Sequence, residues 1–256
     1  MTSYAYILLT RSIHPISLEL IQFMIDSPLY SNYVFYVMID DNNQDISMFV
    51  EKYPKIKFLQ INDDLCKEKG YINMTYSIQK TPVSWDKSIY YFCEVEHNKH
   101  DFYWFIEDDV FIPNKECIYN IDSKYNDTTY HLLSRENSVN ISNNPRLKWP
   151  LWHLAQNKIP LPWFKSLCCA IRISNTLLTV IKNYVFHYKS LFFLELMFPS
   201  LCCQNKLKNK IIPELFPIIF RHKWNYSDIR KNFLYHPIKD YVTQKNYYKQ
   251  LNNINF

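Results

Sequence analysis

Phe102-Tyr103-Trp104-Phe105-Ile106 leads directly into Glu107-Asp108-Asp109, and the chain becomes apolar again at Val110-Phe111-Ile112. An unbroken run of aromatic and aliphatic residues is typical of a strand that is buried on both faces of a sheet. Three consecutive acids at the end of such a strand are costly to bury without partners. Open α/β sheets bind ligands beyond the carboxyl ends of their strands, so we expect a functional site at these acids.

The sequence around this stretch alternates apolar runs with segments of helical periodicity. This alternation predicts a single α/β domain with a mostly parallel central sheet and helices on both faces. The expected strands cover residues 4–10, 33–39, 56–61, 102–106, 131–133 and 167–173. The expected helices cover residues 17–27, 46–53, 87–96 and 175–184, with Ser84 as the N-cap of the third.

Two segments depart from this pattern. Residues 136–165 are polar and rich in Trp and Pro, and we expect a loop region over the sheet. The chain from Gln244 onward is polar, and we expect it to fray.

The composition excludes several classes of protein. The 256 residues include a single glycine, Gly70, whereas loops that hold phosphate through backbone N–H groups need several. Walker A, GxGxxG and kinase glycine-rich loops are therefore absent. The net charge of +5 comes from scattered basic residues, so we expect no nucleic-acid partner.

The cysteines and the hydropathy pattern favour a cytoplasmic protein. The seven cysteines contain no C-x-x-C pair, which favours buried, reduced thiols. No segment approaches the roughly 18 to 20 apolar residues of a membrane span. The apolar residues 4–10 are too few for a signal peptide.

The acid run indicates a cation site. Alternate side chains of an extended chain point the same way, so Glu107 and Asp109 can share one ion. Hard cations such as Mg²⁺ or Mn²⁺ bind carboxylate oxygens together with substrate phosphates. The alternative is an acidic loop that caps the next helix.

This run resembles the D-x-D-like motif of GT-A type glycosyltransferases, which ends a central strand and is often followed by Val-Phe. Here the motif is Glu107-Asp108-Asp109, with Glu in place of the usual first Asp. The phrase 105–111 is also similar to glycosyltransferase-like proteins of algae and protists. Heavy use of Lys, Asn, Ile and Tyr favours an AT-rich genome, such as that of a large DNA virus or a protist. A viral protein would lie in the host cytoplasm or the virion.

The resemblance implies a GT-A-like, Rossmann-like domain over residues 1–243, followed by a polar tail, 244–256. Residues 1–130 would form a nucleotide-binding half, and residues 131–243 a smaller acceptor half. The implied enzyme is a hexosyl- or pentosyltransferase that needs Mn²⁺ or Mg²⁺. Its donor would be a nucleotide-sugar, with UDP favoured, and its acceptor a hydroxyl of a glycan or protein.

In GT-A enzymes the exits of the first and second strands contact the nucleoside, which implies such roles for Thr10, Arg11, Asp40 and Asp41. Asp also favours strand exits as a turn residue, and this alternative stays open for Asp40 and Asp41. The helix before the acid strand often places a basic residue near the donor, here Lys87. The alternative for Lys87 is a solvated side chain.

Several GT-A families end with a His that completes the metal shell and a nearby Lys or Arg that meets the diphosphate. His236 and Lys239 fit this arrangement, and His222 is the competing imidazole. The resemblance therefore implies Glu107, Asp109 and His236 as cation ligands, with Asp108 and Lys239 on the donor side.

Glu195 lies in the strongly apolar stretch Phe192–Pro199. Burial raises the pKa of a carboxyl, which suits a proton acceptor. In inverting GT-A enzymes a carboxylate near this point deprotonates the acceptor hydroxyl, so the resemblance implies that Glu195 is the base. The alternative is that Glu195 pairs with Arg172 or His187 in the core.

Trp149, Trp152, His153 and Trp163 are close together in the sequence. They favour either an acceptor site, because aromatic faces stack on sugar rings, or a hydrophobic lid. Three other functions stay open: an inactive GT-A-like binding or virion-associated protein, a metal-dependent nuclease, and a sugar nucleotidyltransferase. The single glycine disfavours the last.

Overall fold

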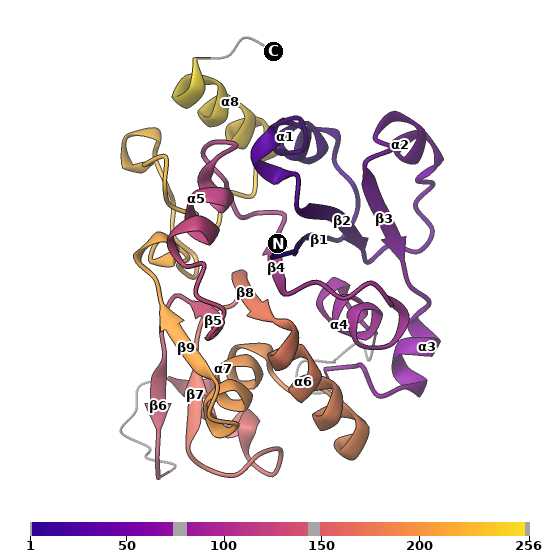
Figure 1. Ribbon diagram of the computed structural model, residues 1–256, viewed down its shortest axis with the longest axis vertical. Helices are drawn as coiled ribbons and strands as arrows, with labels where there is room; N and C mark the ends of the chain where they lie inside the picture. The colour runs from indigo at the N-terminus through magenta and orange to yellow at the C-terminus, as the bar shows by residue number, and fades with distance from the viewer. Residues whose placement is uncertain (1, 74–80, 143–148, 254–256) are drawn as a thin grey trace.

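The computed structural model describes residues 2–73, 81–142 and 149–253 (Figure 1). A seven-stranded sheet runs through the molecule. In spatial order its strands are β3 (Ile56–Gln60), β2 (Tyr33–Ile39), β1 (Tyr4–Thr10), β4 (Phe102–Glu107), β8 (Ala170–Ser174), β5 (Tyr130–Ser134) and β9 (Lys208–Ile211). The β3-β2-β1-β4 part is parallel, β8 runs antiparallel to both neighbours, and β5 pairs with β9 in parallel.

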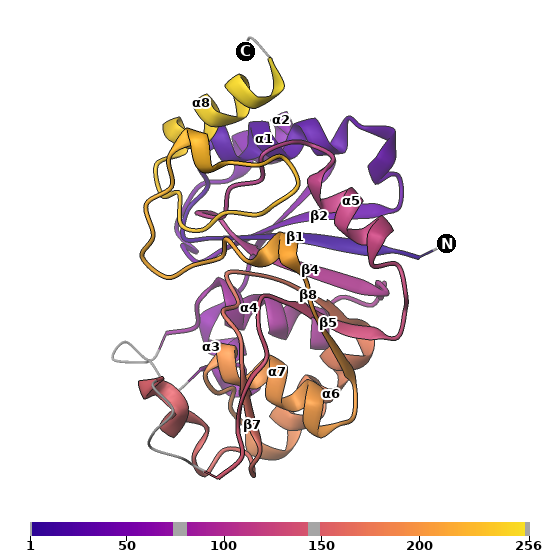
Figure 2. The ribbon, with the colours of Figure 1, turned by 90° about the vertical axis from the view of Figure 1, so that its left-hand side faces the viewer.

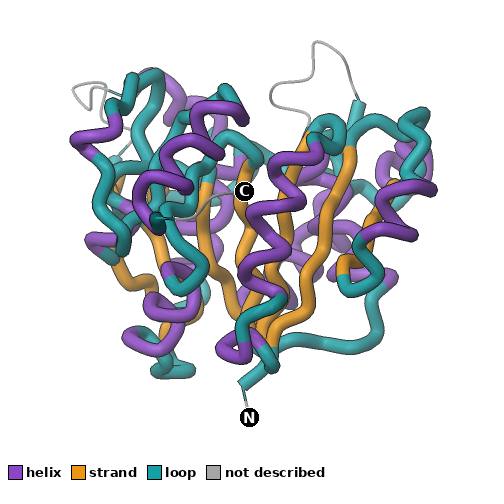
Figure 3. The backbone as a smooth tube through the Cα atoms, turned by 90° about the horizontal axis from the view of Figure 1, so that it is seen from above, coloured by secondary structure: helices purple, strands orange, loops and turns teal. Residues whose placement is uncertain are grey.

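Helices cover both faces of this sheet (Figures 2 and 3). The α-helices of the described chain are α1 (Pro15–Ile25), α2 (Ser47–Lys52), α3 (Asp63–Glu68), α4 (Ser84–Tyr90), α5 (Cys117–Lys124), α6 (Asn175–Tyr188), α7 (Leu194–Gln204) and α8 (Tyr241–Asn252). Short 3-10 helices are η1 (Pro28–Tyr30), η3 (Pro150–Ala155), η4 (Pro213–Leu215) and η5 (Tyr226–Asp228), and the π-helical η2 (Tyr91–Val95) continues α4. In Figure 2, α1, α2, α5 and α8 lie above the sheet, and α3, α4, α6 and α7 lie below it. The mixed α/β fold with a mostly parallel sheet is confirmed.

Strands β1, β2 and β4 are apolar along nearly their whole length because each face of the sheet has its own core. Tyr103 and Phe105 of β4 join the core under α4, α6 and α7. Trp104 and Ile106 join the core under α1 and α5. Extended backbone continues this alternation, so Glu107 emerges on the α4 and α7 side of the sheet.

Three sequence expectations about elements are wrong. Ser84 is the first residue of α4 rather than its N-cap, because Val83 caps the helix and its N–H donates to Asp86 Oδ2 at 3.1 Å. The 136–165 stretch contains η3 and an antiparallel pair, β6 (Ser138–Asn140) with β7 (Trp163–Lys165), although 143–148 lie outside the described residues. The chain from Gln244 to residue 252 is helical, because Asp240 caps α8 and Gln244 is buried.

A buried ion pair fastens β8 to the α5 side of the sheet. Arg172 Nη1 donates to Asp122 Oδ1 at 2.6 Å, and both side chains are buried. Asp122 Oδ2 accepts from the Tyr33 hydroxyl and, at 2.9 Å, from the Trp104 indole N–H. Both carboxylate oxygens of Asp122 are thus satisfied by the chain itself.

Gly70 occupies a position that no other residue type fits. Its φ of +84° lies in the left-handed region. A Cβ there would meet the backbone carbon of Lys189 at 2.7 Å. The single glycine of the chain therefore lets the end of α3 approach the end of α6.

Candidate cation and donor site

The acid run lies at the carboxyl end of β4, fixed from both sides. The N–H of Glu107 donates to the carbonyl of Cys169, the residue immediately before β8, at 2.9 Å. The N–H of Asp108 donates to the carbonyl of Leu9 in β1 at 3.0 Å. The backbone of the motif is therefore held by both neighbouring strands.

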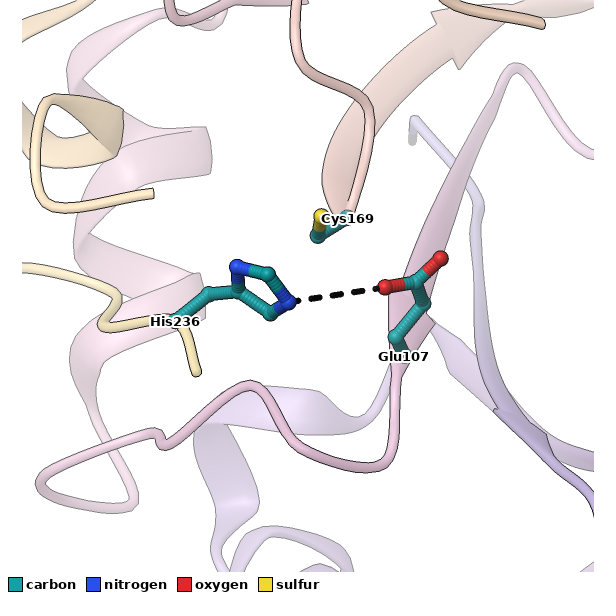
Figure 4. Close-up of side chains that lie close together, drawn as sticks. All are labelled: Glu107, Cys169 and His236. Carbon is teal, nitrogen blue, oxygen red and sulfur yellow. Dashed lines mark ion pairs between the residues drawn. The ribbon is translucent and has the colours of Figure 1, made fainter. Parts of the chain in front are cut away.

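His236 brings an imidazole to this point from a distant part of the sequence. Its Nε2 lies 3.3 Å from Asp109 Oδ1. The same atom lies 3.8 Å from Glu107 Oε2, the ion pair drawn in Figure 4. Its Nδ1 lies 3.1 Å from the carbonyl oxygen of Ile219, which only accepts, so Nδ1 carries the proton. In the neutral ring, the Nε2 lone pair then faces two carboxylates. Such an arrangement needs a proton or a cation between the groups.

The charges of the three groups depend on one another. Burial raises the pKa of Glu107, against the opposing effect of the Trp85 indole N–H, which donates to it at 2.8 Å. Burial opposes ionisation of Asp109 as well, but His236 and Lys239 hold its pKa below the usual value. Burial works against protonation of His236, yet Asp109 and Glu107 raise its pKa.

The residues present fit a divalent cation. Asp109 Oδ1 is buried without a hydrogen-bond partner, and the His236 Nε2 atom lies 3.3 Å from it. Donor atoms of Glu107, Cys169 and His236 all lie within 4.8 Å of one another. Carboxylates and imidazole are common ligands of Mn²⁺, and an unpaired carboxylate oxygen is a ready additional one. Cys169 is a donor that the sequence interpretation missed.

Asp108 points to the opposite side of the sheet. Its Oδ2 accepts from Thr10 Oγ1 at 2.5 Å and from the Tyr241 hydroxyl at 2.8 Å. Gln244 Nε2 donates to its carbonyl at 2.9 Å. These contacts make Asp108 the link between the acid run, β1 and α8.

Lys87 is buried and its ammonium is fully engaged. Its Nζ lies 2.7 Å from the carbonyl of Asp40, 3.2 Å from Asn42 Oδ1 and 2.9 Å from Asp63 Oδ1. Burial raises the pKa of Asp40 to about 6, against the opposing effects of Lys87 and Ser84. Lys87 is therefore placed to hold the exit of β2, and it is not the solvated side chain of the alternative interpretation.

The remaining residues predicted to contact the donor, Arg11, Asp41 and Lys239, are exposed. The carbonyl of Arg11 accepts from the N–H of Asp41 at 2.9 Å, and Asp41 Oδ1 accepts from the N–H of Asn43 at 2.9 Å. Asp41 thus makes the contact expected of a turn residue. The side chain of Lys239 is 81% exposed, with Nζ 3.6 Å from Asp109 Oδ2. It can turn toward an anion beside the acid run.

Glu195, at the start of α7, shares a pocket of about 250 Å³ with Glu107, Trp85 and Asp86. Burial raises the pKa of Glu195 to about 7, with Lys165 opposing. Pairing of Glu195 with Arg172 is wrong, because Arg172 is committed to Asp122. The other proposed partner, His187, lies exposed on α6.

The other ring side chains considered for the site are those of the Trp-rich segment 149–163 and the competing imidazole His222. Trp149 stacks on Phe193, with ring centroids 5.9 Å apart, and Phe193 lines the same pocket as Glu195. Trp152 and Trp163 are buried in the core, and His153 is exposed. The competing imidazole, His222, is exposed and packs on Trp224 with centroids 4.2 Å apart. The structure brings His236, and not His222, to the acids.

Within the described ranges, no helix is both long and apolar enough to cross a membrane.

Comparison with known proteins identifies the fold. No protein-family model and no curated protein sequence matches the chain. A galactosyltransferase LgtC solved with donor and acceptor sugar analogues matches 99% of this chain and 96% of its own, with 10% identity and a TM-score of 0.52. An active-site mutant of LgtC matches 98% and 95%, with 11% identity and a TM-score of 0.50. The chain therefore has the α/β fold of these GT-A-type structures.

A third solved structure is less similar. It is 4-diphosphocytidyl-2C-methyl-D-erythritol synthase from Anaerococcus prevotii, which covers 96% of this chain and 98% of its own. The identity is 10% and the TM-score 0.49.

Proposed function

We propose that the protein is a metal-dependent glycosyltransferase that moves a hexosyl or pentosyl group from a nucleotide-sugar, with UDP favoured, to a hydroxyl of a glycan or protein. The observation that carries this proposal is the meeting of Glu107, Asp109 and His236 at the carboxyl end of β4. In open α/β sheets this edge is where ligands bind. The likeness to LgtC supports the fold that the proposal requires.

The donor end of the site would work through charge. Glu107, Asp109 and His236 would hold Mn²⁺ or Mg²⁺, which when bound offsets the negative charge that develops on the departing diphosphate. Lys239 is exposed and adjacent, so its ammonium can meet the same phosphates. Asp108 would act as a positioning residue, because Thr10 and Tyr241 occupy its carboxylate. Arg11 and the exit of β2 would border the nucleoside.

Glu195 would accept the proton of the acceptor hydroxyl. Its pKa of about 7 makes it a competent base near neutral pH. It shares its pocket with Glu107, so an acceptor there would lie between the base and the cation ligands. A base that activates the acceptor hydroxyl for direct displacement of the nucleotide would give inversion at the anomeric carbon.

Ligand-dependent stabilisation tests the donor class first. We would heat the protein with UDP, GDP, CDP or CMP, each with and without Mn²⁺. A ligand at 100 times its Kd adds about 2.7 kcal/mol to the free energy of unfolding, which raises the melting temperature measurably. We expect one nucleotide to stabilise the wild type only with Mn²⁺ and to leave Asp109→Asn unchanged.

The matched control is Asp26→Asn, an exposed carboxylate at the end of α1. It should respond like the wild type. Donor turnover then separates an enzyme from an inactive binding protein: the proposal expects metal-dependent release of the nucleoside diphosphate from the matching nucleotide-sugar. Nucleotide binding without turnover would favour the binding protein, and no binding by any of the four nucleotides would contradict the donor site.

A further inference from the structure

Cys169 lies beside the carboxylate and imidazole of the cation site. It immediately precedes β8, and its carbonyl accepts from the N–H of Glu107 at 2.9 Å. Figure 4 shows its sulfur close to both the His236 ring and the Glu107 carboxylate. The ladder between β4 and β8 thus fixes the backbone that carries this thiol.

The neighbouring cysteine is oriented elsewhere. Cys168 is buried, and its thiol donates to the carbonyl of Ser166 at 3.2 Å. Cys169 is only partly buried, so a ligand can reach it. Of the vicinal pair, Cys169 alone is grouped with Glu107 and His236.

A thiol changes the chemistry expected of a site built on carboxylates. Mg²⁺ prefers oxygen ligands, whereas Zn²⁺ and Cd²⁺ bind thiolate strongly. Glu107, Cys169 and His236 have donor atoms within 4.8 Å of one another, a spacing from which small side-chain movements reach a shared ion. Asp109 Oδ1, buried and without a hydrogen bond, lies 3.3 Å from the same imidazole.

We propose that Cys169 is a ligand of the cation site and shifts its selectivity toward thiophilic divalent ions of the zinc class. This inference rests on the cation site of the proposed function and adds a sulfur to it. Coordination would form a metal–sulfur bond and release the thiol proton to solvent. Even a site of carboxylates and imidazole binds Zn²⁺ more tightly than Mn²⁺, so the ratio of the two affinities carries the proposal.

Cd²⁺ alone is the first probe, since a cadmium–thiolate bond gives an ultraviolet charge-transfer band. We would titrate Cd²⁺ into the wild type, Cys169→Ser and Cys203→Ser. Cys203 is the matched control, because it is the other partly buried cysteine. We expect the band in the wild type and in Cys203→Ser, and its loss in Cys169→Ser. Retention of the full band in Cys169→Ser would overturn the proposal.

Calorimetric titration then measures the affinities for Zn²⁺ and Mn²⁺. Loss of a residue that only hydrogen-bonds to a metal ligand already costs about 10- to 100-fold in metal affinity, so loss of a direct ligand should weaken Zn²⁺ binding at least 10-fold. Mn²⁺ affinity should change much less, so the Zn²⁺/Mn²⁺ ratio falls. An unchanged ratio would overturn the proposal. Cys169→Ala, with its unfolding midpoint measured, provides a second variant in case the serine disturbs the fold.

The two proposals fail in different ways. No cadmium band, together with Mn²⁺-dependent nucleotide binding, would overturn the role of Cys169 and leave the glycosyltransferase proposal standing. A band that depends on Cys169, without nucleotide binding under any metal, would support the sulfur ligand and contradict the donor site.

Discussion

Two carboxylates near β4, the buried Asp122 and the half-buried Asp109, have opposite environments. Asp122 has both oxygens satisfied, by Arg172 on one side and by Tyr33 and Trp104 on the other. Asp109 keeps one buried oxygen without a hydrogen bond. The chain thus provides internal partners where an acid holds the fold together, and leaves bonding capacity unused where a ligand is expected.

Removing the satisfied acid should have the largest effect on stability. Asp122→Ala leaves the Arg172 guanidinium buried without its counter-ion, which costs about 3–5 kcal/mol of the free energy of unfolding. Denaturant unfolding measures this loss. The exposed Asp26→Ala should stay within about 0.5 kcal/mol of the wild type. A loss below about 1 kcal/mol for Asp122→Ala would contradict the stabilising role that the comparison assigns to Asp122.

Neutralising the unsatisfied acid should affect catalysis instead. Asp109→Asn keeps the shape of the side chain but removes its charge, and we expect kcat to fall about 100- to 1,000-fold. Its present ion-pair partners are an imidazole and an exposed lysine, so the free energy of unfolding should change by less than about 1 kcal/mol. Steady-state kinetics and denaturant unfolding together test this. Equal destabilisation by Asp109→Asn and Asp122→Ala would erase the distinction.

The pH dependence of activity and stability tests the role of a third carboxylate, Glu195. The proposed base, with a pKa of about 7, must be ionised to act, so kcat/KM should rise about tenfold per pH unit below 7 and level off above it. Its folded pKa lies above the ordinary 4.5, so the fold prefers the protonated acid. The ionised form therefore costs stability as pH rises from 4.5 through 7.

The variant Glu195→Gln should be inactive, yet more stable than the wild type above pH 7, with the difference vanishing below about pH 4.5. Rate profiles and unfolding at several pH values measure both effects. The exposed Glu51→Gln should change neither. A wild-type pH profile in Glu195→Gln would assign the base elsewhere.

The smallest expected effect concerns Asp108. Tyr241→Phe removes one of the two hydroxyls that its Oδ2 accepts from, while Thr10 remains. Loss of one such hydrogen bond costs about 0.5–1.5 kcal/mol of stability. We expect a modest fall in activity because the acid run is less firmly placed. Thermal unfolding checks this against Tyr188→Phe, which lies exposed on α6.

The fold was predictable where each strand is buried on both faces. Residues 4–10 and 33–39 are continuous apolar runs, and β1 and β2 have those bounds. The pair β6–β7 is only three residues long on each side, too short for a periodic signal. Helix α8 is polar on most of its surface and carries no clear apolar periodicity, so its cap at Asp240 is evident only in the structure.

The site was predictable where strand ends carry acids, and not where partners come from distant segments. The position of Glu107 and Asp109 follows from the strand before them. Cys169 and Tyr241 were missed because nothing in the local sequence distinguishes them. Cys169 is one of a vicinal cysteine pair, and Tyr241 is a single amphipathic side chain. The positive charge of Lys87 would suit a residue that binds phosphate. Only the packing of α3 shows that its ammonium is already paired with Asp63.

The contacts of the acid run also imply that the site is complete only after the last part of the chain has been synthesised. Glu107 and Asp109 are synthesised long before Cys169, His236 and the tyrosine of α8. A nascent or shortened chain that ends before His236 carries the acids without imidazole, and its motif lacks the support of α8. Ion affinity would therefore report on how completely a newly made chain has assembled.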